Sequence, residues 1–177
     1  VQTCALPILS KIIIFLSWCS WTSGYLTLSP WVCRQAPVKN LIFDILFNKN
    51  DTTKFDKLLK YTNLVLLDIK HIDDKEHKKL TGHSNRKVLE FAQYLSDKNI
   101  PMWVRHVVVP TITDKKEYLE RLGQFLNGLK NVQALDVLPY HDMAIQKYEK
   151  LGIKYPLKGI LPLTKEQAIS ARNIIVN

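Results

Sequence analysis

Apolar residues in the second half of the chain recur in two spacings, one typical of buried strands and one of amphipathic helices. Continuous apolar runs predict strands that are buried on both faces. Apolar residues three and four positions apart predict helices with one buried face. The strands are expected at 64–69, 102–109 and 132–138. The helices are expected at 73–80, 87–97, from about 115 to 129, and from 165 onward.

Polar residues that can begin a helix stand before two of these segments. Thr113 or Asp114 is expected to cap the helix that follows the second strand. Thr164 and Gln167 stand three residues apart, which is the spacing of a capping box. The last helix is therefore predicted to begin at residue 165.

The order of these elements predicts an α/β fold. Strands begin near residues 64, 102 and 132 with a helical segment after each. This spacing is typical of βαβ units and implies a parallel sheet with helices packed on it. Three strands do not close a barrel. The segment is therefore either a small open sheet or part of a larger barrel.

The composition changes sharply along the chain. Only four of the 41 charged residues lie in residues 1–44, although all three cysteines lie there (Cys4, Cys19 and Cys33). One folded domain seldom separates its residue types in this way. We therefore divide the chain into a leader at 1–44, expected to be irregular, and a folded segment at 45–177.

The leader has three interpretations. Residues 12–33 carry no charge, which suits a membrane anchor or a signal peptide, but many serines and threonines interrupt the run. Val1-Gln-Thr-Cys-Ala-Leu-Pro-Ile8 resembles the translation of a common sequencing-library adaptor. We favour a non-native leader, with residues 9–44 read out of frame, and do not expect a membrane anchor. Long-read sequencing of the source DNA tests this hypothesis.

The net charge of +9 permits acidic partners but selects none of them. We do not expect nucleic-acid binding, because the lysines are scattered and no binding motif is present. The chain has no Gly-rich phosphate loop, no Cys-x-x-Cys and no nucleophile elbow. A dinucleotide-binding fingerprint is therefore excluded, and the three cysteines match no zinc spacing.

Ionisable side chains gather where the predicted strands end. In parallel α/β folds, functional groups collect at the carboxyl ends of the strands. Asp68 and Lys70 are two residues apart and so face the same side. A carboxylate, an ammonium, a guanidinium and an imidazole on one rim suit a zwitterionic ligand. The residues concerned are Asp68, Lys70, Arg105, His106, Tyr140 and His141.

Plainer interpretations of the same residues stay open. Asp68 and Lys70 also suit a solvated pair at a strand end, and Arg105 suits an interior residue paired with a carboxylate. His141 also suits a hydrogen-bonded loop. The evenly spaced His71, His77 and His83 fit no common helical face, and we expect them at the surface.

Four sequence blocks together resemble one family. The blocks are Tyr61-Thr-Asn-Leu-Val-Leu-Leu-Asp-Ile-Lys70, Thr81-Gly-His-Ser-Asn85, Trp103-Val-Arg-His-Val-Val-Val-Pro110 and Val137-Leu-Pro-Tyr-His141. Their order and spacing resemble those of the pyruvate formate-lyase activating enzymes, and the likeness runs from about residue 45 to the end. These activases belong to the radical S-adenosylmethionine (SAM) enzymes.

The resemblance implies a fold, a chemistry and a set of partners. It implies the carboxyl-terminal part of a partial (β/α)6 TIM-like barrel. Family members use a [4Fe–4S] cluster and S-adenosylmethionine to generate a 5'-deoxyadenosyl radical, which abstracts a hydrogen from a glycine of the partner lyase. A flavodoxin or ferredoxin donor and a cytoplasmic location are also implied. By motif, the residues lining the S-adenosylmethionine and substrate side are Asp68, Ile69, Lys70, His141 and, with weaker support, Arg105.

The chain departs from the family pattern in its cluster motif. The family binds the cluster through Cys-x3-Cys-x2-Cys, whereas Cys4, Cys19 and Cys33 have other spacings. The Gly-Gly-Glu motif for the methionine amino group is also missing. Cysteine thiolates are what hold such clusters. We therefore expect no metal-binding or catalytic residue in this chain and no activity. The alternatives are a non-catalytic remnant that binds S-adenosylmethionine or the lyase, and a protein anchored in a membrane through residues 12–33.

Overall fold

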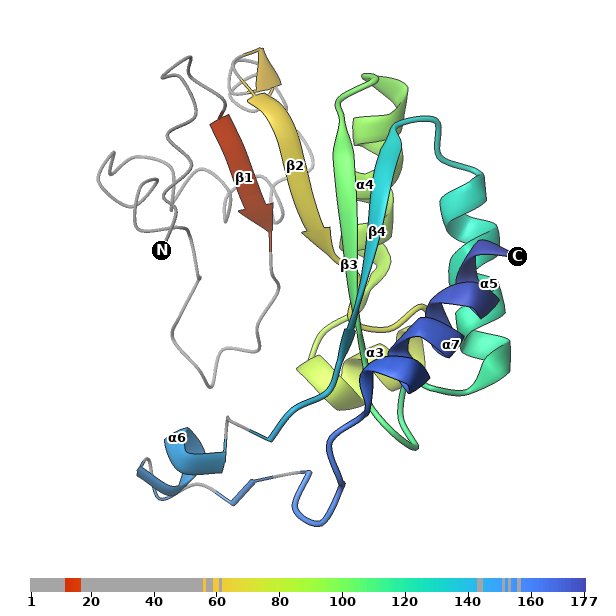
Figure 1. The fold of residues 1–177 in the computed structure, drawn as a ribbon. Helices are drawn as coiled ribbons and strands as arrows, with labels where there is room; N and C mark the ends of the chain where they lie inside the picture. The colour runs from red at the N-terminus through yellow and green to blue at the C-terminus, as the bar shows by residue number, and fades with distance from the viewer. Residues whose placement is uncertain are drawn as a thin grey trace, which may run out of the picture.

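A parallel sheet organises the part of the chain that the computed structural model describes, which comprises residues 12–16, 56, 59–60, 62–142, 145–150, 152, 154–155 and 157–177. Within these residues the sheet has four parallel strands in the order β1-β2-β3-β4 (Figure 1). The strands are β1 Ile12–Leu16, β2 Thr62–Asp68, β3 Met102–Val108 and β4 Val132–Pro139.

Helices connect the strands and follow the last one. The predicted α/β class and parallel sheet are confirmed, and the strand ranges agree to within two residues. Between β2 and β3 lie α3 Asp74–Thr81 and α4 Arg86–Asp97, and between β3 and β4 lies α5 Lys116–Asn127. The helices α6 Ile145–Lys150 and α7 Lys165–Val176 follow β4.

The first strand comes from the segment that we expect to be irregular. That expectation does not hold at Ile12–Leu16, where β1 pairs in parallel with β2 from Ile12 opposite Thr62 to Leu16 opposite Leu67. β-Branched isoleucines favour extended backbone, which fits the Ile-Ile-Ile-Phe-Leu sequence of β1. The rest of 1–44, including Cys4, Cys19 and Cys33, lies outside the described residues. No helix in the described part of the chain is long and apolar enough to cross a membrane.

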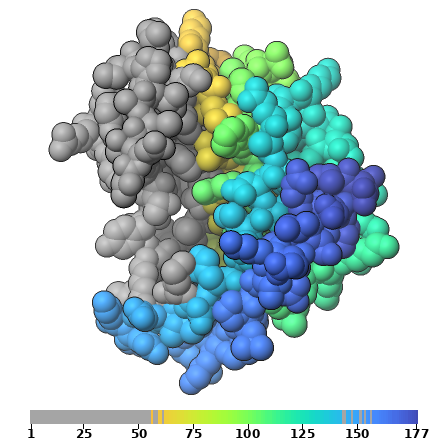
Figure 2. All heavy atoms as spheres, in the orientation of Figure 1, coloured from red at the N-terminus to blue at the C-terminus, as the bar shows by residue number. Residues whose placement is uncertain are grey.

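One face of the sheet carries the hydrophobic core. The buried side chains alternate along β3, with Met102, Val104 and Val108 all at 1% exposure or less. They pack with Val65 and Leu67 of β2 and with apolar faces of α4, α5 and α7. In the space-filling view, atoms of β4 and α7 lie against each other on the visible surface (Figure 2). The helices α4, α5 and α7 therefore cover the same face of the sheet.

The two predicted helix starts have different outcomes. Thr164 accepts a hydrogen bond from the Gln167 amide, and the Gln167 side chain accepts one from the Thr164 amide, so the capping box is confirmed. The cap expected at Thr113 or Asp114 is wrong, because α5 begins after Lys115 without a side-chain cap. Thr113 is buried instead, and its hydroxyl accepts from the Val109 amide (2.7 Å) and donates to the Val107 carbonyl (3.0 Å). It therefore closes the turn after β3.

Gly123 allows the backbones of α5 and α7 to approach closely. A Cβ atom at this position would lie 2.1 Å from the Ile175 carbonyl oxygen, well inside contact distance. A side chain here would force the two helices apart.

We expect Gly123→Ala to destabilise the fold by about 2–3 kcal/mol, because the overpacking cost exceeds the gain in helix propensity. Gln124→Ala, at the exposed neighbouring position, is the matched control and should change stability by less than about 0.5 kcal/mol. Urea denaturation measures both. An unchanged or raised stability for Gly123→Ala would contradict the close helix contact.

Candidate functional site

The candidate site centres on a buried carboxylate at the end of β2. Asp68 is 5% exposed, and its two oxygens bind two different cations. Arg105 Nε donates to Oδ1 (2.7 Å), and Lys70 Nζ donates to Oδ2 (3.0 Å). The interpretation of Asp68 as part of a solvated pair is therefore wrong, because its carboxylate is buried, and the pairing of Arg105 with a carboxylate is confirmed. The two cations place charge-assisted hydrogen-bond donors beside this carboxylate.

Strand register brings these side chains together. Asp68 lies directly opposite Arg105 in the β2–β3 ladder, and Arg105 lies opposite Asp136 of β4. Partners in register project from the same face of a sheet. Trp103, two residues before Arg105, lies on this same face and is 42% exposed. The charged cluster therefore lies on the face opposite the helix-covered core.

Ile69 and His106 point to the other face of the sheet. The Ile69 side chain is 1% exposed within the hydrophobic core, so only its backbone lies at the strand end. Its amide donates to the Arg105 carbonyl (3.0 Å), and its carbonyl lies 2.7 Å from His106 Nδ1. The predicted convergence of His106 with Arg105 is wrong, because consecutive strand residues face opposite sides.

His141 follows β4 and is exposed. The preceding residue, Tyr140, is anchored three times: its amide donates to the Val108 carbonyl, its carbonyl accepts from the Leu163 amide (both 3.0 Å), and its hydroxyl lies 2.8 Å from that of Tyr155. In the described part of the chain no polar contact joins His141 to the Asp68 cluster. The structure thus brings together Asp68, Lys70 and Arg105, and leaves His141 separate.

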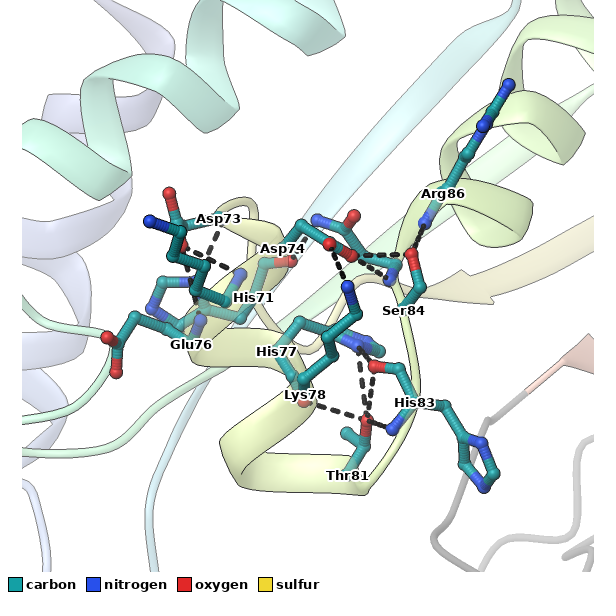
Figure 3. A network of polar contacts seen from close by, with 12 residues as sticks. His71, Asp73, Asp74, Glu76, His77, Lys78, Thr81, His83, Ser84 and Arg86 are labelled. Atoms are coloured by element: carbon teal, nitrogen blue, oxygen red, sulfur yellow. Dashed lines mark hydrogen bonds and ion pairs between the residues drawn. The ribbon is translucent and has the colours of Figure 1, made fainter.

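The connection after Lys70 is held by the network in Figure 3. Asp73 caps α3 by accepting from the amides of Lys75 and Glu76, and Asp74 accepts from the Ser84 hydroxyl (2.5 Å). The Asn85 side chain donates to the carbonyls of His71 (3.1 Å) and Ile72 (2.6 Å). The Thr81–Asn85 block therefore acts as a structural connector that fixes the chain leaving β2.

Buried histidines were missed by the sequence analysis. His71 and His77 are 1% and 2% exposed, so the expectation that they lie at the surface is wrong. His71 Nδ1 accepts from the Asp73 amide (3.0 Å), and His77 Nδ1 lies 2.7 Å from the His83 carbonyl oxygen. The signal for His106 was present in the sequence, because it shares the alternation of the buried residues Val104 and Val108.

Burial lowers the pKa of all three histidines, because desolvation disfavours the charged imidazole. The effect is largest at His106, whose pKa is lowered to about 4 by burial, and the nearby Lys70 ammonium lowers it further. The three imidazoles are therefore neutral near pH 7.

Comparison with known proteins identifies the family. The sequence profile of the Radical SAM superfamily matches residues 32–122, which is half of the chain. The chain belongs to the radical SAM superfamily. Within the described residues of this radical SAM chain, no three His, Cys, Asp or Glu side chains are grouped to hold a metal ion.

Two curated relatives of this radical SAM chain share one name. It is 48% identical over 122 residues to the pyruvate formate-lyase-activating enzyme of Streptococcus mutans, covering 69% of this chain and 46% of that protein. It is 50% identical over 117 residues to the enzyme of the same name from Staphylococcus epidermidis, covering 64% and 47%. The chain thus spans about half the length of the curated relatives it matches.

A solved structure supports the fold. A domain of a pyruvate-formate lyase-activating enzyme from Bacteroides vulgatus superimposes with a TM-score of 0.55 at 17% identity, covering 68% of this chain and 65% of that one. At this identity the likeness concerns the fold alone.

The buried histidines predict how the stability of this radical SAM chain depends on pH. An unfolded histidine binds its proton near pH 6.5, and folded His106 only near pH 4, so the unfolded state binds more protons between these values. Stability is therefore lost as pH falls through this window. Between about pH 7.5 and pH 5 His106 alone should account for about 2 kcal/mol.

Urea denaturation across this pH range checks the expectation. His106→Asn removes the titrating group and should flatten the curve, whereas His83→Gln, at an exposed histidine, should not. A wild-type unfolding free energy that stays constant from about pH 7.5 to 5 would show that these histidines are not buried as neutral groups.

Proposed function

We propose that residues 45–177 form the carboxyl-terminal part of a barrel of the pyruvate formate-lyase-activating type, and that the rim at the ends of β2 and β3 binds S-adenosylmethionine. The observation that carries this proposal is the buried Asp68 carboxylate held by Lys70 and Arg105. The 44–50% identity to the curated activating enzymes supports it independently.

The donor set fits the methionine end of S-adenosylmethionine. Lys70 and Arg105 supply charge-assisted hydrogen-bond donors for the ligand carboxylate. Asp68 supplies an acceptor for an amino or hydroxyl group while it orients both cations. Ile69 contributes through its backbone, since its side chain lies in the core. We include His141, which follows β4, in the proposed site on the strength of the family resemblance alone.

The family's activity is part of the proposal for the whole protein. A [4Fe–4S] cluster and S-adenosylmethionine together supply one-electron chemistry that removes a hydrogen atom from a glycine of pyruvate formate-lyase. The partners of the whole protein would be that lyase and an electron donor such as flavodoxin or ferredoxin. We propose a cytoplasmic location on the same basis.

The residues of this chain do not fit the cluster. Cluster ligation requires closely spaced thiolates. Fourteen residues separate Cys4 from Cys19 and thirteen separate Cys19 from Cys33. We therefore propose that the chain with this sequence binds S-adenosylmethionine at its rim without cleaving it, and no reaction step is assigned to it.

The binding proposal predicts the behaviour of charge-removing variants. Lys70→Met and Arg105→Met should each weaken S-adenosylmethionine binding by about tenfold or more, because each removes a charge-assisted hydrogen bond. Lys116→Met removes an exposed lysine paired only with Glu120 and should leave the affinity unchanged. Isothermal titration of the full chain measures this. Equal losses in all three variants, or no binding by the wild type, would contradict the proposed site.

The cluster proposal has its own test. After anaerobic reconstitution with iron and sulfide, we expect iron well below the four atoms per chain that a [4Fe–4S] cluster needs, and no cleavage of S-adenosylmethionine. Near-stoichiometric iron together with cleavage would overturn this part of the proposal and leave the binding test unaffected.

A further inference from the structure

A buried imidazole lies directly behind the charged cluster. His106 is 3% exposed, and its Nδ1 lies 2.7 Å from the Ile69 carbonyl oxygen. A carbonyl oxygen only accepts hydrogen bonds, so Nδ1 carries the proton of the neutral ring. Nε2 then carries a lone pair, and it is buried without a hydrogen-bond partner among the described residues. His106 is thereby fixed in one tautomer.

The hydrogen bond from His106 to the Ile69 carbonyl lies where the backbone pairing of β2 and β3 ends. The last register pair between β2 and β3 is Asp68 opposite Arg105. One residue further, the Ile69 amide still donates to the Arg105 carbonyl, but the Ile69 carbonyl is bonded by a side chain. That carbonyl belongs to the peptide group between Ile69 and Lys70. His106 therefore restrains the peptide plane from which the Lys70 side chain departs.

Two consecutive residues of β3 thus hold the last residue of β2, Asp68, and the residue that follows it, Ile69. Arg105 binds the Asp68 side chain on the open face, and His106 binds the Ile69 carbonyl on the core face. Together they restrain the segment on both faces of the sheet. An apolar residue would fill the His106 position without a buried, unpartnered nitrogen, which is costly. The hydrogen-bond donor is what histidine adds at this position.

We propose that His106 is a positioning residue: it fixes the Ile69–Lys70 peptide and so sets the direction in which Lys70 meets Asp68 and an anionic ligand. This inference rests on the proposed S-adenosylmethionine site where it is tested by ligand affinity. Its test by the chemical reactivity of Lys70 needs only the Asp68–Lys70 ion pair. The lowered pKa of His106 agrees with a permanently neutral ring.

A matched pair of variants separates the effect of the His106 hydrogen-bond donor from the effect of its side-chain volume. Asn places an amide donor near the position of Nδ1, and Leu has a similar size without a donor. We expect His106→Leu to weaken S-adenosylmethionine binding by about tenfold and His106→Asn by less than about threefold, since one hydrogen bond is involved. Equal effects of the two variants would overturn the proposal. Urea denaturation gives the folded fraction of each, so that affinities refer to folded protein.

A double-mutant cycle tests whether His106 acts through Lys70. In the Lys70→Met background, His106→Leu should cost less than about twofold in affinity, because the group that it positions is already gone. The same tenfold loss in both backgrounds would indicate general loosening and overturn the proposal.

A measurement without ligand distinguishes the positioning role of His106 from the proposed S-adenosylmethionine site. Lys70 is paired with Asp68 and partly buried, so its amine should react slowly with an acetylating reagent. Measured by mass spectrometry relative to Lys116 of the same molecule, acetylation of Lys70 should rise several-fold in His106→Leu but not in His106→Asn. Absence of ligand binding together with this pattern would reject the S-adenosylmethionine site and retain the positioning role. Unchanged acetylation in His106→Leu would overturn the positioning role.

Discussion

The buried carboxylate of Asp68 is the constraint on which the rest of the rim depends. An ion that is removed from water must be compensated, and here one cation comes from the same segment and the other from the next strand. Both oxygens are engaged, so the relative position of β2 and β3 at their carboxyl ends is set by charge. The sheet upstream of this point is held by apolar packing and backbone pairing instead.

The chain leaving the rim is fixed by polar contacts to backbone. The Asn85 side chain donates to two carbonyls just after Lys70. Asp73 caps the helix α3 that follows, and Asp74 accepts from the Asn85 amide beyond its end. These contacts leave little freedom to the residues on either side of the site. Order at the rim is therefore achieved by hydrogen bonding, although the fold as a whole is organised by its hydrophobic face.

The sequence predicted the helices and strands better than it predicted which side chains are buried and which face of the sheet they occupy. Hydrophobic periodicity located three strands and four helices, because burial against one sheet face imposes regular spacing. Family blocks pointed to Asp68, Lys70 and Arg105, which the structure brings together. The burial of His71 depended on long-range contact with the carbonyl of Ile112, which no local pattern contains. The strand at Ile12–Leu16 was hidden by the unusual composition around it.

The alternation of Arg105 and His106 also limits how this strand can evolve. The two residues serve opposite faces of one sheet, so a single-residue insertion or deletion before them would exchange their surroundings. A guanidinium would then enter the apolar layer, and an imidazole would meet the carboxylate. A substitution at either position affects one face of the sheet, whereas a change of length in β3 would disrupt both faces together. Length variation among descendants of this sequence should therefore fall in the loops that flank β3.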